Sequence, residues 1–154
     1  MGIEIERKYL VDREKWEALK KPAGVLYRQG YISTNPEKTI RVRITPDHSY
    51  LTIKGPNTGA SRSEFEYEIP IKDAEELLTQ FAETELSKTR YTIEFGGKIW
   101  EVDEFSGDNI GLITAEIELQ SEVETFPIPD WIKEDVTGQE KYYNSNLTLR
   151  PFND

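Results

Sequence analysis

The sequence predicts an α+β fold that is mainly antiparallel β, with a few helices at its ends and margins. Most of its apolar residues alternate with polar ones in short runs, and this period of two is that of a half-buried strand. Gly96-Gly97 separates two such runs as a hairpin signal, and residues 46–49 form a second expected turn. Neighbouring strands should therefore run antiparallel. The length of 154 residues fits a single domain over residues 1–154.

Eight segments have strand character, and they fill most of the chain. They are Ile3–Val11, Leu26–Ser33, Thr39–Thr45, Tyr50–Lys54, Ser63–Ile71, Lys88–Phe95, Lys98–Phe105 and Leu112–Ser121. Helical signals are few: Asp12 can cap a helix over 13–20, and Asp73 can cap one over 74–81. One or two short helices are expected after Pro129, and residues 55–61 have the composition of a loop.

Composition excludes several kinds of site. With 19 basic and 29 acidic residues the net charge is −10, which disfavours binding to nucleic acid or to an anionic membrane surface. Without Cys, and with His48 as the one histidine, the chain has no thiol nucleophile, no poly-histidine metal centre and no convincing Ser/His/Asp triad. The chemistry must use carboxylates, Lys, Arg, Tyr or metals held by oxygen. The N-terminus lacks the basic and apolar regions of a secretory signal, so a cytoplasmic protein is expected.

The polar faces of the strands are unusually charged. Successive side chains of a strand point to opposite faces, so Glu4, Glu6 and Lys8 lie opposite Ile3, Ile5 and Tyr9. The other strands repeat this pattern, and each commits mainly to carboxylates or mainly to cations. Their charged residues are Arg41, Arg43, Lys54, Glu64, Glu66, Glu68, Lys88, Arg90, Glu101, Asp103, Glu116 and Glu118.

Two architectures fit these faces. One is a sandwich whose charged faces are solvated, as one-sided antiparallel sheets commonly are. The other is a closed sheet with the charges inside, since eight strands leave room for one elongated ligand. Unpaired buried charges would cost more than a domain's net stability of about 5 to 15 kcal/mol. Mg²⁺ or Mn²⁺ on the carboxylates and a polyphosphate on Arg and Lys would satisfy both sets of charges.

The ordered series resembles the CYTH superfamily, also called triphosphate tunnel metalloenzymes. The resemblance rests on Glu4-x-Glu6-x-Lys8, Arg41-x-Arg43, Lys54, the Glu64/Glu66/Glu68 strand, Lys88-x-Arg90, Asp103 and Glu116-x-Glu118. Segments 28–31 and 143–147 are similar to small bacterial members. The resemblance implies a closed, eight-stranded, tunnel-like barrel with a charged interior and a few flanking helices. It also implies hydrolysis or cyclisation of a triphosphate with a divalent metal.

The resemblance also implies roles for single residues. Phosphate oxygens would be held by Lys8, Arg41, Arg43, Lys54, Lys88 and Arg90. Mg²⁺ or Mn²⁺, two ions per site, would be held by Glu4, Glu6, Asp103, Glu116, Glu118, Glu64 and Glu68. The catalytic residues would be Lys88, Tyr31 and Glu66, although Glu64, Glu66 and Glu68 share one face and the sequence leaves their register open.

The predicted function is metal-dependent hydrolysis of a triphosphate inside the tunnel, with inorganic tripolyphosphate as the first candidate substrate. The short chain has no clear set of aromatic residues for reading a base. Two enzymatic alternatives remain, a class IV-type adenylyl cyclase and a nucleoside or thiamine triphosphatase. An alternative of another class is a noncatalytic polyphosphate- or nucleotide-binding protein. Two or three helices are not expected to cover all of the outward-facing apolar residues. The uncovered residues suggest a homodimer.

Overall fold

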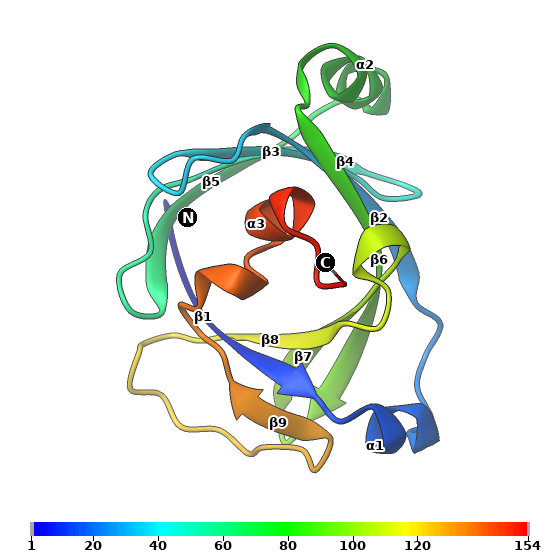
Figure 1. Cartoon of the computed structure of the whole chain (residues 1–154). Helices are drawn as coiled ribbons and strands as arrows, with labels where there is room; N and C mark the ends of the chain where they lie inside the picture. The colour runs from blue at the N-terminus through cyan, green and yellow to red at the C-terminus, as the bar shows by residue number, and fades with distance from the viewer. Residues whose placement is uncertain (1, 154) are drawn as a thin grey trace.

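The computed structural model describes residues 2–153, and its strands form a closed antiparallel barrel (Figure 1). Eight strands follow one another around the barrel in the order β1, β5, β4, β3, β2, β6, β7, β8, and β8 pairs again with β1. The strands are β1 (Gly2–Val11), β2 (Val25–Ser33), β3 (Thr39–Ile44), β4 (Ser49–Lys54), β5 (Ser61–Glu68), β6 (Thr84–Phe95), β7 (Lys98–Phe105) and β8 (Ile113–Glu118). The closed barrel that the sequence predicts is confirmed.

The turns follow from local sequence. Gly96 and Gly97 both have positive φ, at 59° and 79°, which is the backbone of the tight hairpin expected between β6 and β7. Residues 45–48 join β3 to β4, and the N–H of Thr45 donates to the carbonyl oxygen of His48. Both expected turns are therefore present, and they lie at the same end of the barrel.

A ninth strand, β9 (Ile132–Asp135), lies outside the barrel beside the second half of β1. β5 pairs with residues 2–5 of β1, and β9 pairs farther along at residues 9 and 11. The sequence predicts only helices after Pro129, so this strand was missed. It is short and mostly exposed, and its residues lack the alternation of a half-buried strand.

Three α-helices and two 3₁₀ helices complete the described chain. They are α1 (Arg13–Ala18), α2 (Ile71–Phe81), η1 (Gly107–Asn109), η2 (Glu140–Tyr142) and α3 (Asn144–Leu149). Asp12 caps α1 as expected, because its side chain accepts a hydrogen bond from the N–H of Lys15. The predicted cap at Asp73 is wrong: α2 begins at Ile71 after Pro70, and Asp73 lies in the first turn. None of these helices has the length and apolar character needed to cross a membrane.

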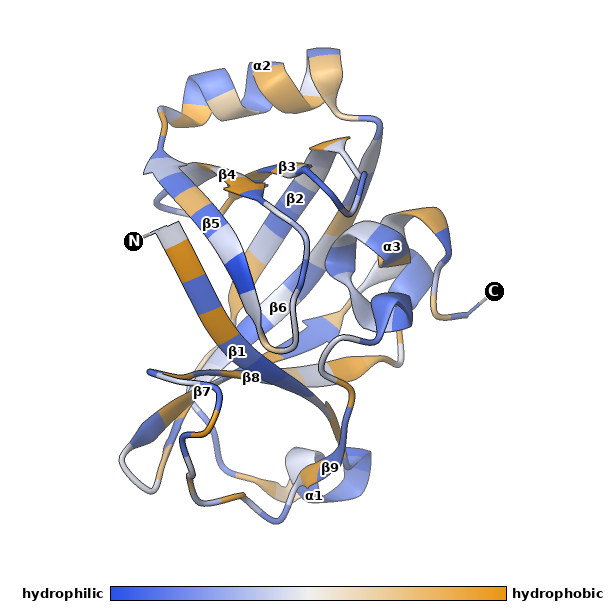
Figure 2. Ribbon diagram, turned by 90° about the vertical axis from the view of Figure 1, so that its left-hand side faces the viewer, coloured by the Kyte–Doolittle hydropathy of each residue, from blue (hydrophilic) through white to orange (hydrophobic). Residues whose placement is uncertain are grey.

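Much of the apolar core lies outside the barrel. The alternation along the strands turns one apolar face outward, as the colouring of β1 illustrates (Figure 2). α2 covers part of this face by packing Ala74 and Leu78 against Val42. A second cluster, with Trp16, Trp100 and Trp131 in edge-to-face contact, covers β7 and β8. Because the core is outside, the inward faces are free to carry charge.

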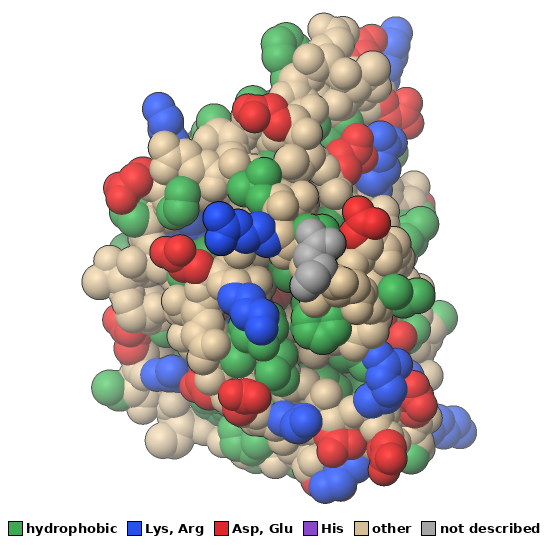
Figure 3. All heavy atoms as spheres, in the orientation of Figure 1, with side chains coloured by type: hydrophobic (Ala, Val, Ile, Leu, Met, Phe, Trp, Pro, Cys, Tyr) green, Lys and Arg blue, Asp and Glu red, His purple; other side chains and the backbone are tan. Residues whose placement is uncertain are grey.

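The C-terminal segment fills one end of the barrel. α3 lies within the ring of strands in the view down the barrel (Figure 1). Its Leu147 is buried in a third apolar cluster, whose other members are Leu86, Phe105, Leu112, Val136 and Tyr142. Over the outer face of this end, acidic and basic side chains are intermixed rather than separated (Figure 3). This end of the barrel is therefore packed with protein.

Candidate active site

The interior holds a cavity of about 360 Å³ whose wall is almost entirely charged or polar. Side chains from all eight barrel strands reach it, because each strand turns its charged face inward. Its cations are Lys8, Arg41, Arg43, Lys54, Arg62, Lys88 and Arg90. Its carboxylates are Glu4, Glu6, Glu64, Glu66, Glu101, Glu116 and Glu118. Most of the sequence-predicted charges therefore converge on one cavity inside the barrel.

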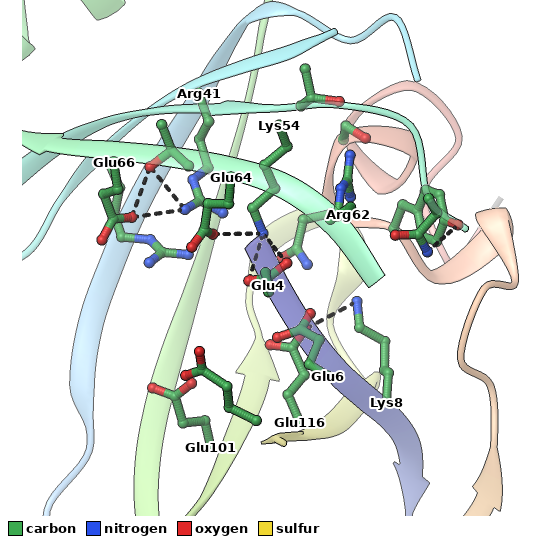
Figure 4. A pocket seen from close by; sticks show the side chains of 18 of the residues that line it. Glu4, Glu6, Lys8, Arg41, Lys54, Arg62, Glu64, Glu66, Glu101 and Glu116 are labelled. Carbon is green, nitrogen blue, oxygen red and sulfur yellow. Dashed lines mark hydrogen bonds and ion pairs between the residues drawn. The ribbon is translucent and has the colours of Figure 1, made fainter. Parts of the chain in front are cut away.

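Ion pairs connect neighbouring and next-but-one strands along the cavity wall (Figure 4). The ammonium of Lys54 on β4 lies 3.1 Å from Glu4 on β1 and 3.3 Å from Glu64 on β5. Lys8 lies 3.6 Å from Glu116, and Arg41 lies 3.5 Å from Glu66. Each pair joins groups from different strands, so the barrel's register fixes their positions before any ligand binds.

The structure shows which glutamates of β5 line the cavity. Glu64 and Glu66 line it, whereas Glu68 does not. The Glu68 carboxylate instead lies 2.9 Å from Nδ1 of His48 at the turn between β3 and β4, and both side chains are exposed. Glu68 is therefore separated from the other predicted metal ligands.

Asp103 is also placed differently from the cavity carboxylates. It is 1% exposed and does not line the cavity. Its carboxylate accepts two hydrogen bonds from Arg90, at 2.8 and 2.9 Å, and lies 2.8 Å from the ammonium of Lys88. Burial opposes its ionisation, but Arg90 and Lys88 hold the pKa of Asp103 below its usual range. Asp103 thus pairs with Lys88 and Arg90 without lining the cavity itself.

Lys88 is the most deeply buried cation of the cavity, at 1% exposed. Its ammonium donates to Oδ1 of Asn144 on α3 at 2.9 Å and lies over the ring of Phe105. Burial lowers the pKa of Lys88 to about 7 despite the attraction of Asp103. Near neutral pH this amine can therefore gain or lose a proton.

Two glutamates on β1 and β8, Glu6 and Glu116, have pKa values shifted in opposite directions. Burial, together with Glu116 and Glu4, raises the pKa of Glu6 well above its usual value. Burial also opposes ionisation of Glu116, but Lys8 and Arg90 hold its pKa well below the usual value. The two carboxyl groups lie within hydrogen-bonding reach of each other. A divalent cation between the two carboxyl groups would favour ionisation of Glu6.

The sequence-predicted residues fall into two groups. Glu4, Glu6, Lys8, Tyr31, Arg41, Arg43, Lys54, Glu64, Glu66, Lys88, Arg90, Glu116 and Glu118 line the cavity, and Asp103 and Glu68 do not. Arg62 also lines it but was missed, and Glu101 lines it although the sequence analysis placed it on a charged face without a role. Arg62 lies two residues from Glu64 on β5, so the period of two could have identified it.

Comparisons with known proteins agree with this geometry. Residues 2–150 match the CYTH domain family. An inorganic triphosphatase of Acetivibrio thermocellus is 50% identical over 153 residues, covering 99% of this chain and 97% of that protein. One of Nitrosomonas europaea is 34% identical over 155 residues, covering 95% and 97%.

Solved structures have the same fold. A crystal structure of an inorganic triphosphatase superposes with a TM-score of 0.64 at 31% identity, covering 95% of this chain and 97% of that chain. The PH1012 protein from Pyrococcus horikoshii superposes with a TM-score of 0.59 at 20% identity, covering 77% and 79%. The second likeness concerns the fold alone.

Proposed function

The chain belongs to the CYTH domain family, and we propose that it is an inorganic triphosphatase that hydrolyses tripolyphosphate inside its barrel. One observation carries the proposal: seven cations and seven carboxylates from separate strands line one interior cavity. The two inorganic triphosphatases that match nearly the whole chain support the same substrate. We propose that the catalytic unit is the single domain predicted over residues 1–154.

The cations have spare capacity for an anion. In the described part of the chain, neither Arg43 nor Arg62 has an acidic partner within ion-pair distance. The buried Nε–H of Arg41 has no hydrogen-bond partner within the same residues. Unpaired guanidinium groups with low exposure call for an anion, and their forked N–H groups match phosphate oxygens. A linear triphosphate would satisfy these donors together.

The carboxylates fit a divalent cation by their chemistry. The carboxyl groups of Glu6 and Glu116 lie close together, and Glu4 lies within hydrogen-bonding reach of Glu64. Within residues 2–153 the acidic groups meet in such pairs, and no three of them form a ready ligand set. We propose that Glu4, Glu6, Glu116 and Glu118, with Glu64, hold Mg²⁺ or Mn²⁺, whose ligands are preferentially oxygen atoms. A second ion per site stays a prediction. Asp103 and Glu68 have no such support.

The chain's own residues account for the remaining steps. Arg41, Arg43 and Arg90 would bind the phosphate oxygens and stabilise the charge that develops during phosphoryl transfer. A bound divalent cation would neutralise phosphate charge and lower the pKa of a water molecule. Lys88, with a pKa of about 7, would hold or release a proton at Nζ beside the substrate. Glu66 would orient the attacking water, and Tyr31 would donate a hydrogen bond.

The cavity also bears on the alternative substrates. Four tyrosines line it, Tyr27, Tyr31, Tyr50 and Tyr143, and two guanidinium groups lie over the ring of Tyr27, that of Arg43 at 4.9 Å and that of Arg90 at 5.0 Å. A ring already stacked in this way is less available to a nucleobase or thiazolium ring. Tyr27 therefore gives no support to a nucleoside or thiamine triphosphate, or to the ATP of a cyclase, over an inorganic chain.

A substrate panel tests the proposal. Tripolyphosphate, pyrophosphate, ATP and thiamine triphosphate are incubated with the protein and either Mg²⁺ or Mn²⁺, and phosphate release is measured. We expect tripolyphosphate to be the best substrate, and Arg41→Ala or Glu116→Ala to abolish turnover while circular dichroism stays unchanged. Binding of tripolyphosphate without phosphate release would instead indicate a noncatalytic sensor, and cyclic AMP formation from ATP would indicate a cyclase.

We also infer a homodimer. Phe65 and Tyr67 project outward from β5 and are 49% and 56% exposed. Ile53, the cross-strand partner of Phe65, and Ile3 on β1 extend this surface. We define these four residues as the β5 patch. Neighbouring apolar side chains of this kind are typical of a protein interface. The cytoplasmic location stays a prediction from the sequence.

A further inference from the structure

Gln29 is a fully buried polar residue for which the proposed mechanism has no role. It lies on β2 between Arg28 and Gly30, with its side chain on the inner face of the barrel, and it is 0% exposed. Gln29 does not line the cavity, but it contacts two residues that do, Arg43 and Tyr31. A buried amide with two such partners is placed to control both of them.

The contact with Arg43 fixes the orientation of the amide. Nε of Arg43 donates to Oε1 of Gln29 at 3.2 Å. A guanidinium nitrogen can only donate, so the atom of Gln29 that faces it must be the carbonyl oxygen. The amide nitrogen therefore faces the opposite way, toward Tyr31.

The contact with Tyr31 then fixes the direction of a proton. Nε2 of Gln29 donates to the phenol oxygen of Tyr31 at 3.0 Å. The phenol oxygen accepts this bond, so its own hydrogen must point elsewhere. Within residues 2–153 the O–H of Tyr31 donates to no other residue, and Tyr31 lines the cavity. The O–H of Tyr31 is thus available to an oxygen atom of a molecule in the cavity.

We infer that Gln29 is a positioning residue that makes Tyr31 a hydrogen-bond donor to the substrate and holds Arg43 against the same substrate. The inference rests on the proposed function, because the acceptor of the Tyr31 proton is a phosphate oxygen. Arg43 fixes the orientation of the Gln29 amide. The amide in turn fixes the direction of the Tyr31 O–H, and this O–H donates to the triphosphate. No charge on Gln29 itself is required.

Gln29→Glu tests this chain of contacts with almost no change in shape. A carboxylate still accepts from Arg43, but it offers Tyr31 an acceptor where the amide offered a donor. The Tyr31 proton would then turn toward residue 29 and away from the substrate. We expect kcat for tripolyphosphate to fall on the order of 10²-fold, the typical effect of losing one transition-state donor. Tyr31→Phe should lower kcat by a similar factor.

The double variant separates this role from a merely structural one. If Gln29 acts through Tyr31, adding Gln29→Glu to Tyr31→Phe causes little further loss in kcat. If the two losses multiply, the inference is wrong. Gln29→Leu removes the contact with Arg43 as well, so it should also raise KM. Gln80→Glu, the same change at an exposed position on α2, is the control and should leave kcat and KM unchanged.

The wild-type arm separates this inference from the proposed function. Absence of tripolyphosphate turnover by wild-type protein would remove the proposed function, and the donor role of Tyr31 with it. Normal wild-type turnover, with kcat of Gln29→Glu within twofold of wild type, would overturn the inference alone.

Discussion

At the scale of single residues, the cavity depends on groups that substrate would never contact. Asp103 lies behind the cavity and neutralises Lys88 and Arg90, and Gln29 sets the hydrogen bonds of Arg43 and Tyr31. Burying several cations side by side is unfavourable unless each has a partner. These two residues make the charged wall compatible with a folded protein.

Removing the charge of Asp103 should therefore destabilise the fold. Asp103→Asn leaves two buried cations without their shared carboxylate, and breaking a buried pair typically costs about 3 to 5 kcal/mol. We expect a loss of this size in urea unfolding at neutral pH, together with loss of turnover. Glu94→Gln, an exposed change on β6, is the control. A free energy of unfolding of Asp103→Asn within about 0.5 kcal/mol of wild type, the usual range for surface changes, would contradict the role given to Asp103.

Glu68 should affect His48 and not the reaction. The hydrogen bond that Nδ1 of His48 donates to Glu68 raises the pKa of His48. Their pairing therefore stabilises the fold below the unfolded pKa, and this stabilisation is lost as pH rises through the folded pKa. Glu68→Gln should lower the His48 pKa, which is measured directly by NMR because the chain has one histidine. Turnover should be unchanged, whereas Glu64→Gln should abolish it. Loss of turnover in Glu68→Gln would show that Glu68 takes part in the reaction.

The alternation of charge was sufficient to predict most cavity residues, and its failures have a physical cause. Glu64, Glu66 and Glu68 are equivalent by their period of two, but Glu68 is the last residue of β5 and lies beside His48 at the turn between β3 and β4, outside the cavity. Asp103 shares its face with Glu101, yet it faces Lys88 and Arg90, and this depends on the pairing of β6 with β7. Such contacts join distant strands and are not contained in any local pattern.

At the scale of elements, α3 links the packed end of the barrel to the site. Leu147 anchors the helix in an apolar cluster, and Asn144, at its first turn, accepts a hydrogen bond from Lys88. A second bond joins Thr84 on β6 to Thr148. The sequence predicts short helices in this segment, but not that one would enter the barrel. Its burial depends on space left by eight strands, which only the closed fold defines.

Leu147→Ala tests this link. Truncating a leucine that is 1% exposed should cost about 2 to 5 kcal/mol in urea unfolding. Turnover should also fall, because a loosened α3 no longer holds Asn144 against Lys88. Leu149→Ala on the same helix, at a residue that is 53% exposed, is the matched control and should change neither quantity. Equal stability losses in the two variants would show that α3 is not anchored at Leu147.

At the scale of the whole molecule, the fold inverts the usual arrangement of charged and apolar strand faces. Its charged faces point inward, and much of its apolar core packs on the outside, beneath α1, α2 and the segment before β9. The sequence alone left a solvated sandwich and a closed barrel both possible, because alternation does not say which face is covered. The closure of β1 onto both β5 and β8 decides between them.

The same inversion leaves the β5 patch uncovered and predicts a dimer. Light scattering at micromolar concentration should give twice the mass of one chain. Phe65→Glu should give a monomer, because a carboxylate in an apolar interface loses its hydration without a partner. Ile110→Glu, at another exposed apolar residue, should leave the dimer intact. A monomeric wild-type protein would exclude the dimer without affecting the site.

The central claim is that this chain binds a triphosphate within the barrel, between its cations and its carboxylates. Its most direct test is a crystal structure grown with Mn²⁺ and a non-hydrolysable imidotriphosphate. We predict phosphate density inside the cavity, in contact with Arg41, Arg43 and Arg90, and an anomalous manganese peak beside Glu6 and Glu116. Both ligands bound on the outer surface, with the cavity holding only water, would contradict the account.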